Sequence, residues 1–319
     1  GVKALIDVLI TGGTGFIGQS LAKKLIGDSK YNLRFFSRRS VGLPNEFFGD
    51  ISNVQSIKKA LSGVEVVIHL AALTPDLKKK TDKNSNDFQE INHQGVRNLA
   101  QCAAEAGVKR FIFLSSIKVN GESTENRAPF LPFQADPKDM YGQSKFEAEQ
   151  LLFDLAVETQ MEIVIIRPPL VYGEGVKGNF ASLVEVVRRG IPLPFGLLHS
   201  NRRSMVSVYN LVDLIINCIS NSRAASQIFL VSDDEDLSTA GLLVHLASAM
   251  GKRLWLLPVP IWLFLIIGKL TGRSSMVGRL VGSLQVDIQH TKDLLDWEPP
   301  FSVSESIKLT LESTFADKE

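Results

Sequence analysis

Short apolar segments that alternate with helix-like stretches constrain the fold of this chain more than any other feature. Branched and aromatic side chains form runs that predict β-strands at residues 7–10, 33–36, 64–68, 111–114, 163–166 and 228–231. Helix-like stretches lie between them at residues 52–61, 89–106 and 141–160. Strands of this wholly apolar kind are typical of a parallel sheet that is covered by helices on both faces. The expected fold class is therefore α/β, a doubly wound parallel sheet.

A glycine-rich loop at residues 11–18 (TGGTGFIG) joins the first predicted strand to the first helix. Glycines let the backbone approach a pyrophosphate, and the helix N-terminus supplies N–H donors and positive potential. Because strand, glycines and helix come in the required order, the loop predicts a Rossmann-like dinucleotide site. Cofactor contacts are expected from Gly12, Gly15, Phe16, Ile17 and Gly18.

The end of the second predicted strand bears on the choice of cofactor. An NAD enzyme usually carries an acid there for the ribose 2′-hydroxyl, but this strand is followed by Arg38 and Arg39. Guanidinium groups suit a 2′-phosphate, so NADP is favoured, with NAD as the alternative if the arginines are solvated. Further cofactor contacts are expected from Ser37, Arg38, Arg39, Asp50, Ile51, Leu70, Ala71 and Ala72.

The length of the chain and a change in its composition predict two lobes. At 319 residues it exceeds what one hydrophobic core usually supports. After Pro168 and Pro169, glycine and proline become frequent and the alternation lapses. We expect a dinucleotide-binding Rossmann domain at residues 1–170 and a smaller, mainly substrate-binding lobe at 171–319, with about 206–235 returning to pack on the Rossmann domain.

Tyr141 and Lys145 open a helix-like stretch, and their spacing of four places them on one helix face. An ammonium near a phenol favours the phenolate, so a group with a pKa of about 10 works as a base nearer neutral pH. Ser115 and Ser116 follow the fourth predicted strand, and catalytic groups of open α/β sheets gather at the carboxyl ends of strands. The pattern predicts a catalytic serine, tyrosine and lysine.

In order and spacing, these motifs resemble the extended short-chain dehydrogenase/reductase family, within it the NAD-dependent epimerases and dehydratases, and are close to UDP-sugar 4-epimerases and nucleotide-sugar 4-ketoreductases. The resemblance covers nearly the whole chain. It rests on residues 11–18, 69–72, 92, 115–121, 141–145, 167–173, 179, 203 and 294–300.

The resemblance implies a role for each matching residue. Ser116, rather than Ser115, would hydrogen-bond the reacting sugar oxygen. Tyr141 would be the acid/base, and Lys145 its electrostatic partner and a ligand of the cofactor ribose. Asn92 would support the backbone around Lys145, unless it is an N-cap or a buried amide.

Substrate contacts are also implied. Asn179 and Arg203 match positions that contact the nucleotide diphosphate, with Arg279 as a weaker candidate. Where dehydratases carry an Asp-Glu pair, this chain has Ile117 and Lys118, so elimination of water is not expected. Lys118 would instead donate to the sugar or a keto oxygen, or lie on the surface. Asn120 replaces a family tyrosine, which predicts a more polar pocket wall.

Composition narrows the partners and the compartment. A net charge of +1 gives no reason to expect nucleic acid as partner. Two distant cysteines, Cys102 and Cys218, fit a reducing, cytoplasmic setting. The five histidines show no ligand spacing, so no metal is expected. A homodimer through residues 89–106 and 141–160 is implied by the resemblance alone.

An apolar run at residues 254–270 is interrupted by Pro258 and Pro260. A spanning helix needs about 20 apolar residues, so no membrane span is expected. We expect a core or lid element; the alternative is an exposed patch that touches lipid or a partner.

The expected activity is NAD(P)-dependent hydride transfer at C4 of a UDP-sugar, with a lean towards 4-keto-sugar reduction because of the two arginines after Ser37. The alternative is a UDP-glucose or UDP-N-acetylglucosamine 4-epimerase with retained NAD. Two rivals are a non-catalytic dinucleotide sensor or scaffold and a reductase of non-sugar carbonyls. The intact catalytic set argues against the first, and Arg203 with Asn179 against the second.

Overall fold

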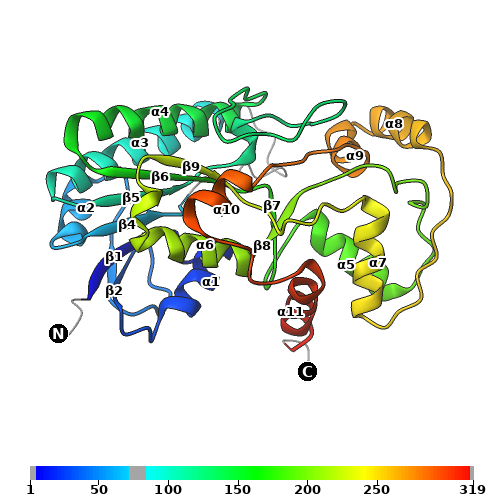
Figure 1. Ribbon diagram of the computed structural model, residues 1–319, viewed down its shortest axis with the longest axis horizontal. Coiled ribbons are helices and arrows are strands. Elements are labelled where there is room, and N and C mark those ends of the chain that lie inside the picture. Colours follow the sequence, from blue (N-terminus) through cyan, green and yellow to red (C-terminus); the bar gives the residue numbers. More distant parts are fainter. Residues whose placement is uncertain (1–4, 72–83, 317–319) are drawn as a thin grey trace.

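The computed structural model describes residues 5–71 and 84–316, without the side chains of 84–92 and 315–316. A seven-stranded parallel sheet with the order β3-β2-β1-β4-β5-β6-β9 forms its centre (Figure 1). The strands are β1 (Ile6–Thr11), β2 (Tyr31–Ser37), β3 (Glu46–Phe48), β4 (Val66–His69), β5 (Arg110–Leu114), β6 (Glu162–Arg167) and β9 (Gln227–Leu230). The expected doubly wound fold is confirmed. Chain order reverses between β1 and β4, where open α/β sheets bind their ligands.

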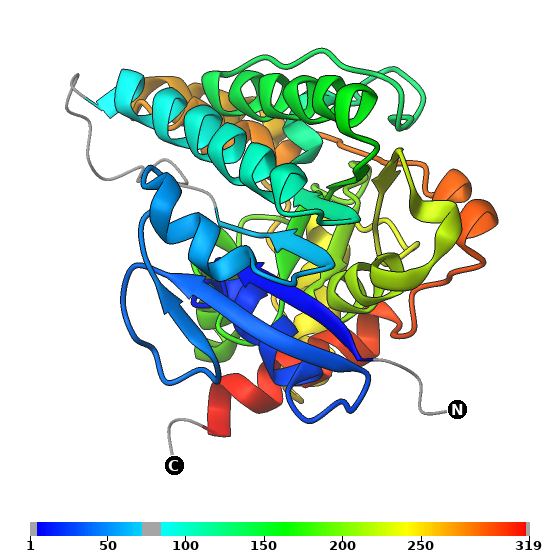
Figure 2. The ribbon, with the colours of Figure 1, turned by 90° about the vertical axis from the view of Figure 1, so that its left-hand side faces the viewer.

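Helices cover both faces of this sheet (Figure 2). One layer holds α2 (Val54–Leu61), α3 (Asn84–Glu105) and α4 (Met140–Thr159), and the other holds α1 (Phe16–Leu25) and α6 (Val208–Ser220). Within β1, Leu9 points into the core of the first layer, whereas Val8 and Ile10 point into the core of the second. This two-sided burial is the reason why the strands are apolar throughout.

The C-terminal half of the chain forms most of a second lobe (Figure 1). This lobe has a hydrophobic core of its own. It is built from the parallel pair β7 (Leu170–Tyr172) and β8 (Met205–Ser207) with α5 (Asn179–Arg189), α7 (Thr239–Ala249) and α11 (Val303–Ala316). α6 packs instead into the same core as α1, and β9 is a strand of the large sheet. α10 (Gln289–Leu295) contacts β9. The division of the chain at residue 170 stays a prediction.

The apolar run at residues 254–270 is not a buried core helix, although Leu254 and Leu256 pack against the core of the second lobe. The expected role as a lid stays a prediction. The C-terminal part of the run is α8 (Ile261–Leu270), which packs on α9 (Ser274–Val281). Of the ten residues of α8, all of them described, only Gly268 is buried. The helix touches the lobe along one narrow side, so most of its circumference stays exposed. In the described part of the chain, no helix is both long enough and apolar enough to cross a membrane.

Candidate active site

The glycine loop between β1 and α1 packs directly against the end of β4. Gly12 has a φ of +74°, and a Cβ there would lie 2.5 Å from the backbone nitrogen of Ala71. A Cβ on Gly18 would lie 2.0 Å from the carbonyl oxygen of Gly12. Neither position tolerates a side chain, and so the helix begins in close contact with the end of the strand.

The N-terminus of α1 faces the open side of this loop. Gly15 is the N-cap, no side chain caps the helix, and its first turn holds no acid. The N–H groups of that turn are therefore available to an anion, and the helix dipole adds positive potential. A Cβ on Gly15 would meet only the Gly12 carbonyl oxygen, at 3.4 Å. This cradle fits the pyrophosphate of a dinucleotide.

One cavity of about 380 Å³ joins the glycine loop to the predicted catalytic residues. It lies at the carboxyl ends of β1, β5 and β6, beside the reversal in strand order. The lining consists of Gly12, Gly15, Phe16, Ile17, Gly18, Leu70, Leu114, Ser115, Ser116, Tyr141, Lys145, Pro168, Pro169 and Val171. The sequence analysis counted residues 167–173 among the motifs of the resemblance but assigned no site role to the last three lining residues, because apolar side chains carry no chemical signature.

The two serines after β5 have different partners. The hydroxyl of Ser115 is buried and donates to Glu149 at 2.5 Å. Ser116 is the N-cap of η1 (Ile117–Val119), where its Oγ accepts from the N–H of Lys118 at 3.2 Å. The proton of the Ser116 hydroxyl thus remains available, whereas that of Ser115 is already donated to a carboxylate. This geometry supports Ser116 as the serine that meets a ligand.

Tyr141 and Lys145 lie one turn apart at the start of α4, but their electrostatics differ from the expectation. Burial first, and then the charge of Asp139, raise the pKa of Tyr141 to about 12. The Lys145 Nζ lies 5.8 Å from the centre of the Tyr141 ring and donates to the carbonyl of Leu114 at 3.1 Å. The predicted lowering of the tyrosine pKa is therefore wrong for this structure, because desolvation outweighs the ammonium at that distance.

Lys145 itself is buried, which lowers its pKa to about 8, and the charge of Glu149 acts in the opposite direction. His69 lies nearby at the end of β4, where burial and then the charge of Lys145 lower its pKa to about 3. The His69 ring is hydrogen-bonded to Thr11 at 2.5 Å and stacks on Phe113. This neutral histidine is a structural support for the loop end.

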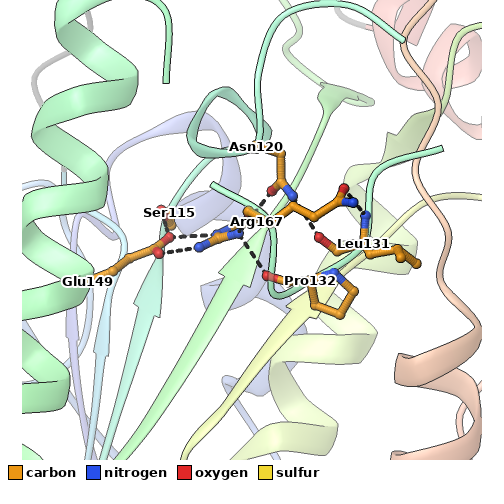
Figure 3. A network of polar contacts seen from close by, with 7 residues as sticks. Ser115, Asn120, Leu131, Pro132, Glu149 and Arg167 are labelled. Atoms are coloured by element: carbon orange, nitrogen blue, oxygen red, sulfur yellow. Dashed lines mark hydrogen bonds and ion pairs between the residues drawn. The ribbon is translucent and has the colours of Figure 1, made fainter. Parts of the chain in front are cut away.

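Arg167 and Glu149 form a buried ion pair in which Glu149 also accepts from Ser115 (Figure 3). The side chains are 2% and 0% exposed, and their closest atoms are 2.6 Å apart. Arg167 also donates to Asn120 Oδ1 at 3.0 Å and to the carbonyl of Pro132 at 2.9 Å. The pair joins α4 to the end of β6 and to the loop after η1.

This network overturns the expectation for Asn120. The side chain is 1% exposed; its oxygen accepts from Arg167 and its nitrogen donates to the carbonyl of Leu131 at 2.8 Å. Asn120 therefore holds the guanidinium and does not make the pocket wall polar. Glu149 was missed by sequence reasoning, although its spacing of four from Lys145 places it on the same helix face.

The residues expected around the adenosine end lie at the edge of the sheet. Ser37 donates to the carbonyl of Arg39 at 2.8 Å. Arg38 and Arg39 are exposed, and neither guanidinium forms a hydrogen bond or ion pair with any residue in the described ranges. Hydrogen bonds from Ser52, followed by the charge of Arg38, lower the pKa of Asp50. Asp50 is thus ionised, and one of its carboxylate oxygens already accepts hydrogen bonds from Ser52.

The structure describes only some of the remaining residues that were predicted to contact the cofactor. Leu70 lines the cavity, and Ala71 follows it beside the glycine loop. Ile51 packs towards α3, into the core of that layer. Ala72 lies outside the described residues, and Asn92 lies in α3 within the part whose side chains are not described. Both roles stay predictions.

The predicted substrate residues do not line the 380 Å³ cavity as described. Burial and the nearby positive charge of Arg279 lower the pKa of Arg203. Neither guanidinium has a hydrogen bond or ion pair within residues 5–71 and 84–316, so this pair of like charges suits an anion. Asn179 begins α5 and is exposed. Lys118 is ion-paired with Asp139 and lies 3.4 Å from Glu122.

The glycine cradle, the cavity and the predicted catalytic residues that line it fit a nicotinamide-dependent enzyme of the extended short-chain dehydrogenase/reductase type. A family model described as the NAD dependent epimerase/dehydratase family matches residues 8–231. The chain belongs to this family.

Individual proteins are similar to nearly the full chain. A UDP-glucose 4-epimerase of Vibrio cholerae is 47% identical over 96% of this chain and 95% of its own length. An N-acetyl-alpha-D-glucosaminyl-diphospho-ditrans,octacis-undecaprenol 4-epimerase of Escherichia coli O157:H7 is 28% identical over 97% and 95%. The structure of a UDP-glucuronic acid 4-epimerase from Bacillus cereus in complex with NAD has a TM-score of 0.77 at 18% identity, over 98% of this chain and 100% of that one. The structural likeness supports the fold.

Gly18→Ala is expected to abolish dinucleotide binding, because its Cβ would collide with the Gly12 carbonyl and push the loop off β4. Gly278→Ala is the matched control, since this glycine also lies in a helix but has open space around it. Nicotinamide fluorescence titration measures both. Normal affinity in Gly18→Ala would contradict the cradle.

Glu149→Gln is expected to lower the free energy of unfolding by about 3–5 kcal/mol, because it leaves the Arg167 charge buried and uncompensated. The control is Glu185→Gln, which breaks exposed ion pairs of α5 and is expected to cost less than about 1 kcal/mol. Urea denaturation followed by circular dichroism gives both values. Equal losses of unfolding free energy in the two variants would show that the buried ion pair stabilises the fold no more than the exposed ones do.

Activity is expected to fall as the pH rises through about 8, because Lys145 then loses the proton that gives it its charge. Below that pH the ammonium is intact, so this group imposes no loss on the acid side. The check is a pH profile of kcat/KM for the wild type and for Lys145→Met, whose low residual activity should lack the alkaline fall. A fall that persists in the variant would assign it to another group.

Proposed function

We propose that this enzyme is a UDP-sugar 4-epimerase that retains NAD. The observation that carries the proposal is that Ser116, Tyr141 and Lys145 share one cavity with the glycine cradle. The 47% identity to a UDP-glucose 4-epimerase favours epimerisation over the 4-keto-sugar reduction that the arginines after Ser37 led us to expect. An intact catalytic set also argues against a sensor or scaffold.

The residues of the chain divide the chemistry between them. Tyr141 takes the proton of the sugar C4 hydroxyl and later returns it, while Ser116 donates a hydrogen bond to the same oxygen. Burial disfavours the phenolate in the structure as described, so we propose that the Lys145 ammonium offsets part of that cost when substrate and cofactor are bound. NAD, when bound, supplies reversible hydride transfer at C4. The sugar has to present its other face in between, so its ring must be held loosely.

We favour NAD over NADP as the retained cofactor. The family is described as NAD dependent, and a similar structure was solved with NAD. Arg38 and Arg39 are exposed, which fits solvated loop residues. Ser37, Asp50 and the residues of the loop remain the proposed contacts of the adenosine and pyrophosphate parts.

The nucleotide diphosphate of the substrate is assigned to Arg203 and Arg279, with Asn179 at the start of α5. Two neighbouring guanidinium groups without a protein anion support this choice. Lys118 is proposed as a weaker contact of the sugar, because it already forms an ion pair with Asp139.

A polyprenol-linked diphosphate sugar is a second candidate substrate. The exposed apolar helix α8 packs on α9, which carries Arg279, and so apolar surface lies near the proposed diphosphate site. The 28% identical relative is named for such a substrate.

We further propose a homodimer that pairs through α3 and α4. A groove of about 470 Å³ runs along these helices, away from the catalytic cavity, and includes Phe146 and Leu151 among its lining. The proposed location is the cytoplasm, because Cys102 and Cys218 are both buried and unpaired.

The purified enzyme is expected to interconvert UDP-glucose or UDP-N-acetylglucosamine with the 4-epimer without added cofactor. Tyr141→Phe should retain bound NAD and lose turnover by at least about 100-fold, because the proton acceptor is gone. Anion-exchange chromatography of the sugar nucleotides measures turnover of the wild type and of the variant, and the same separation after denaturation measures the NAD released from each. Stoichiometric NADPH consumption with a 4-keto sugar would replace the proposal by reduction. Conversion of a polyprenyl diphosphate sugar alone would favour the second candidate.

A further inference from the structure

The outer end of the second lobe carries an exposed apolar surface, here called the α8 surface. It consists of Trp255, Leu257, Trp262, Leu265, Ile266 and Leu270. The Trp262 and Leu270 side chains are 61% and 81% exposed. In Figure 1, α8 lies at the opposite end of the molecule from β1 and β2 of the large sheet. The α8 surface therefore projects away from the Rossmann core.

Packing explains why this side stays uncovered. Gly268 lies against Val277 of α9, where an added Cβ would be 2.9 Å from the valine. Phe264 stacks on Phe195 with ring centres 5.8 Å apart. These two contacts fix one side of α8 to the lobe. Nothing in them requires tryptophan or leucine on the opposite side, where such residues carry a solubility cost.

The charge around the α8 surface is of one sign. Between residues 237 and 286 there is no aspartate or glutamate, so all 34 acidic residues lie elsewhere. The same stretch holds five exposed cations, of which Lys252, Arg253, Lys269 and Arg273 lie outside the proposed diphosphate site to which Arg279 is assigned. Within the described ranges none of them forms an ion pair. A chain with a net charge of only +1 thus concentrates unpaired positive charge here.

Exposed tryptophan and aliphatic side chains flanked by lysine and arginine suit the interface of an anionic bilayer. There the indole rings lie at headgroup depth, the aliphatic side chains enter the acyl boundary and the cations meet lipid phosphates. The ten residues of α8 are too few to span, but enough to lie in the plane of the interface. A protein partner is an outcome that the vesicle test distinguishes, since tryptophan and arginine also occur at protein interfaces.

We propose that the α8 surface docks this enzyme reversibly on an anionic lipid bilayer. The second lobe then faces the membrane and the Rossmann domain points away from it. Docking does not depend on which sugar the enzyme epimerises.

The test is partition of the full-length enzyme onto phosphatidylcholine vesicles with and without phosphatidylglycerol. Partition is expected with the anionic vesicles and should weaken as salt rises, because the cations contribute. Tryptophan emission should shift to shorter wavelength on binding. Trp255 and Trp262 would report the docking, while Trp297 is already buried and gives a constant background.

Leu265→Glu is expected to weaken the partition about tenfold or more, because it places an anion on the apolar surface next to anionic lipid. Val244→Glu is the matched control, since Val244 is 53% exposed on α7 and Leu265 is 46% exposed. Both variants should keep bound dinucleotide and turnover of soluble substrate, which shows that the fold is intact. Failure of the wild type to bind anionic vesicles, or equal binding by Leu265→Glu, would overturn the proposal. So would an oligomer that Leu265→Glu dissociates in the absence of vesicle binding.

Discussion

The buried ion pair between Arg167 and Glu149 fixes the relation between the sheet and the helix that carries the catalytic residues. Removing two charges from water is costly, and such a pair persists only when its remaining donors and acceptors are satisfied. Here Ser115, Asn120 and backbone carbonyls complete it. Ser116 directly follows one of these partners, and Lys145 lies one turn before Glu149. The groups proposed to be catalytic are therefore positioned by the same buried contacts.

A second constraint is the contact between the glycine loop and the end of β4. Side chains at Gly12 or Gly18 would separate strand and helix, and the free N–H groups of α1 would then face the wrong direction. With both constraints in place, cradle and catalytic set open into one cavity at the reversal in strand order. The burial that results is also what moves the Tyr141 and Lys145 pKa values in opposite directions. Burial therefore keeps the Tyr141 hydroxyl protonated near neutral pH and brings the titration of Lys145 down to about pH 8.

Local sequence patterns predicted most of the sheet, the helices α1 to α4 and the glycine cradle, because apolar runs and turn residues are local features of the sequence. The helix α6 of the second layer was not predicted as such. All six predicted strands are present, and only β3 and the short pair β7 and β8 were not delimited. Ser116 could be separated from Ser115 by resemblance, and the geometry gives the reason in the partner of Ser115. The predictions that failed concern residues whose surroundings depend on contacts with residues far away in the sequence. Asn120 binds an arginine 47 residues away, and the exposure of α8 depends on which neighbours cover it. The pKa of Tyr141 follows from burial, which spacing alone does not reveal.

In the proposed reaction, a hydride leaves C4 of the sugar and returns to the same carbon within one site. UDP-glucose that carries deuterium at C4 tests this directly when the enzyme is supplied with no added cofactor. If the enzyme is an epimerase with retained NAD, mass spectrometry will find the deuterium still at C4 of the UDP-galactose formed. Product that has lost the deuterium to solvent or to a free cofactor pool would contradict the claim.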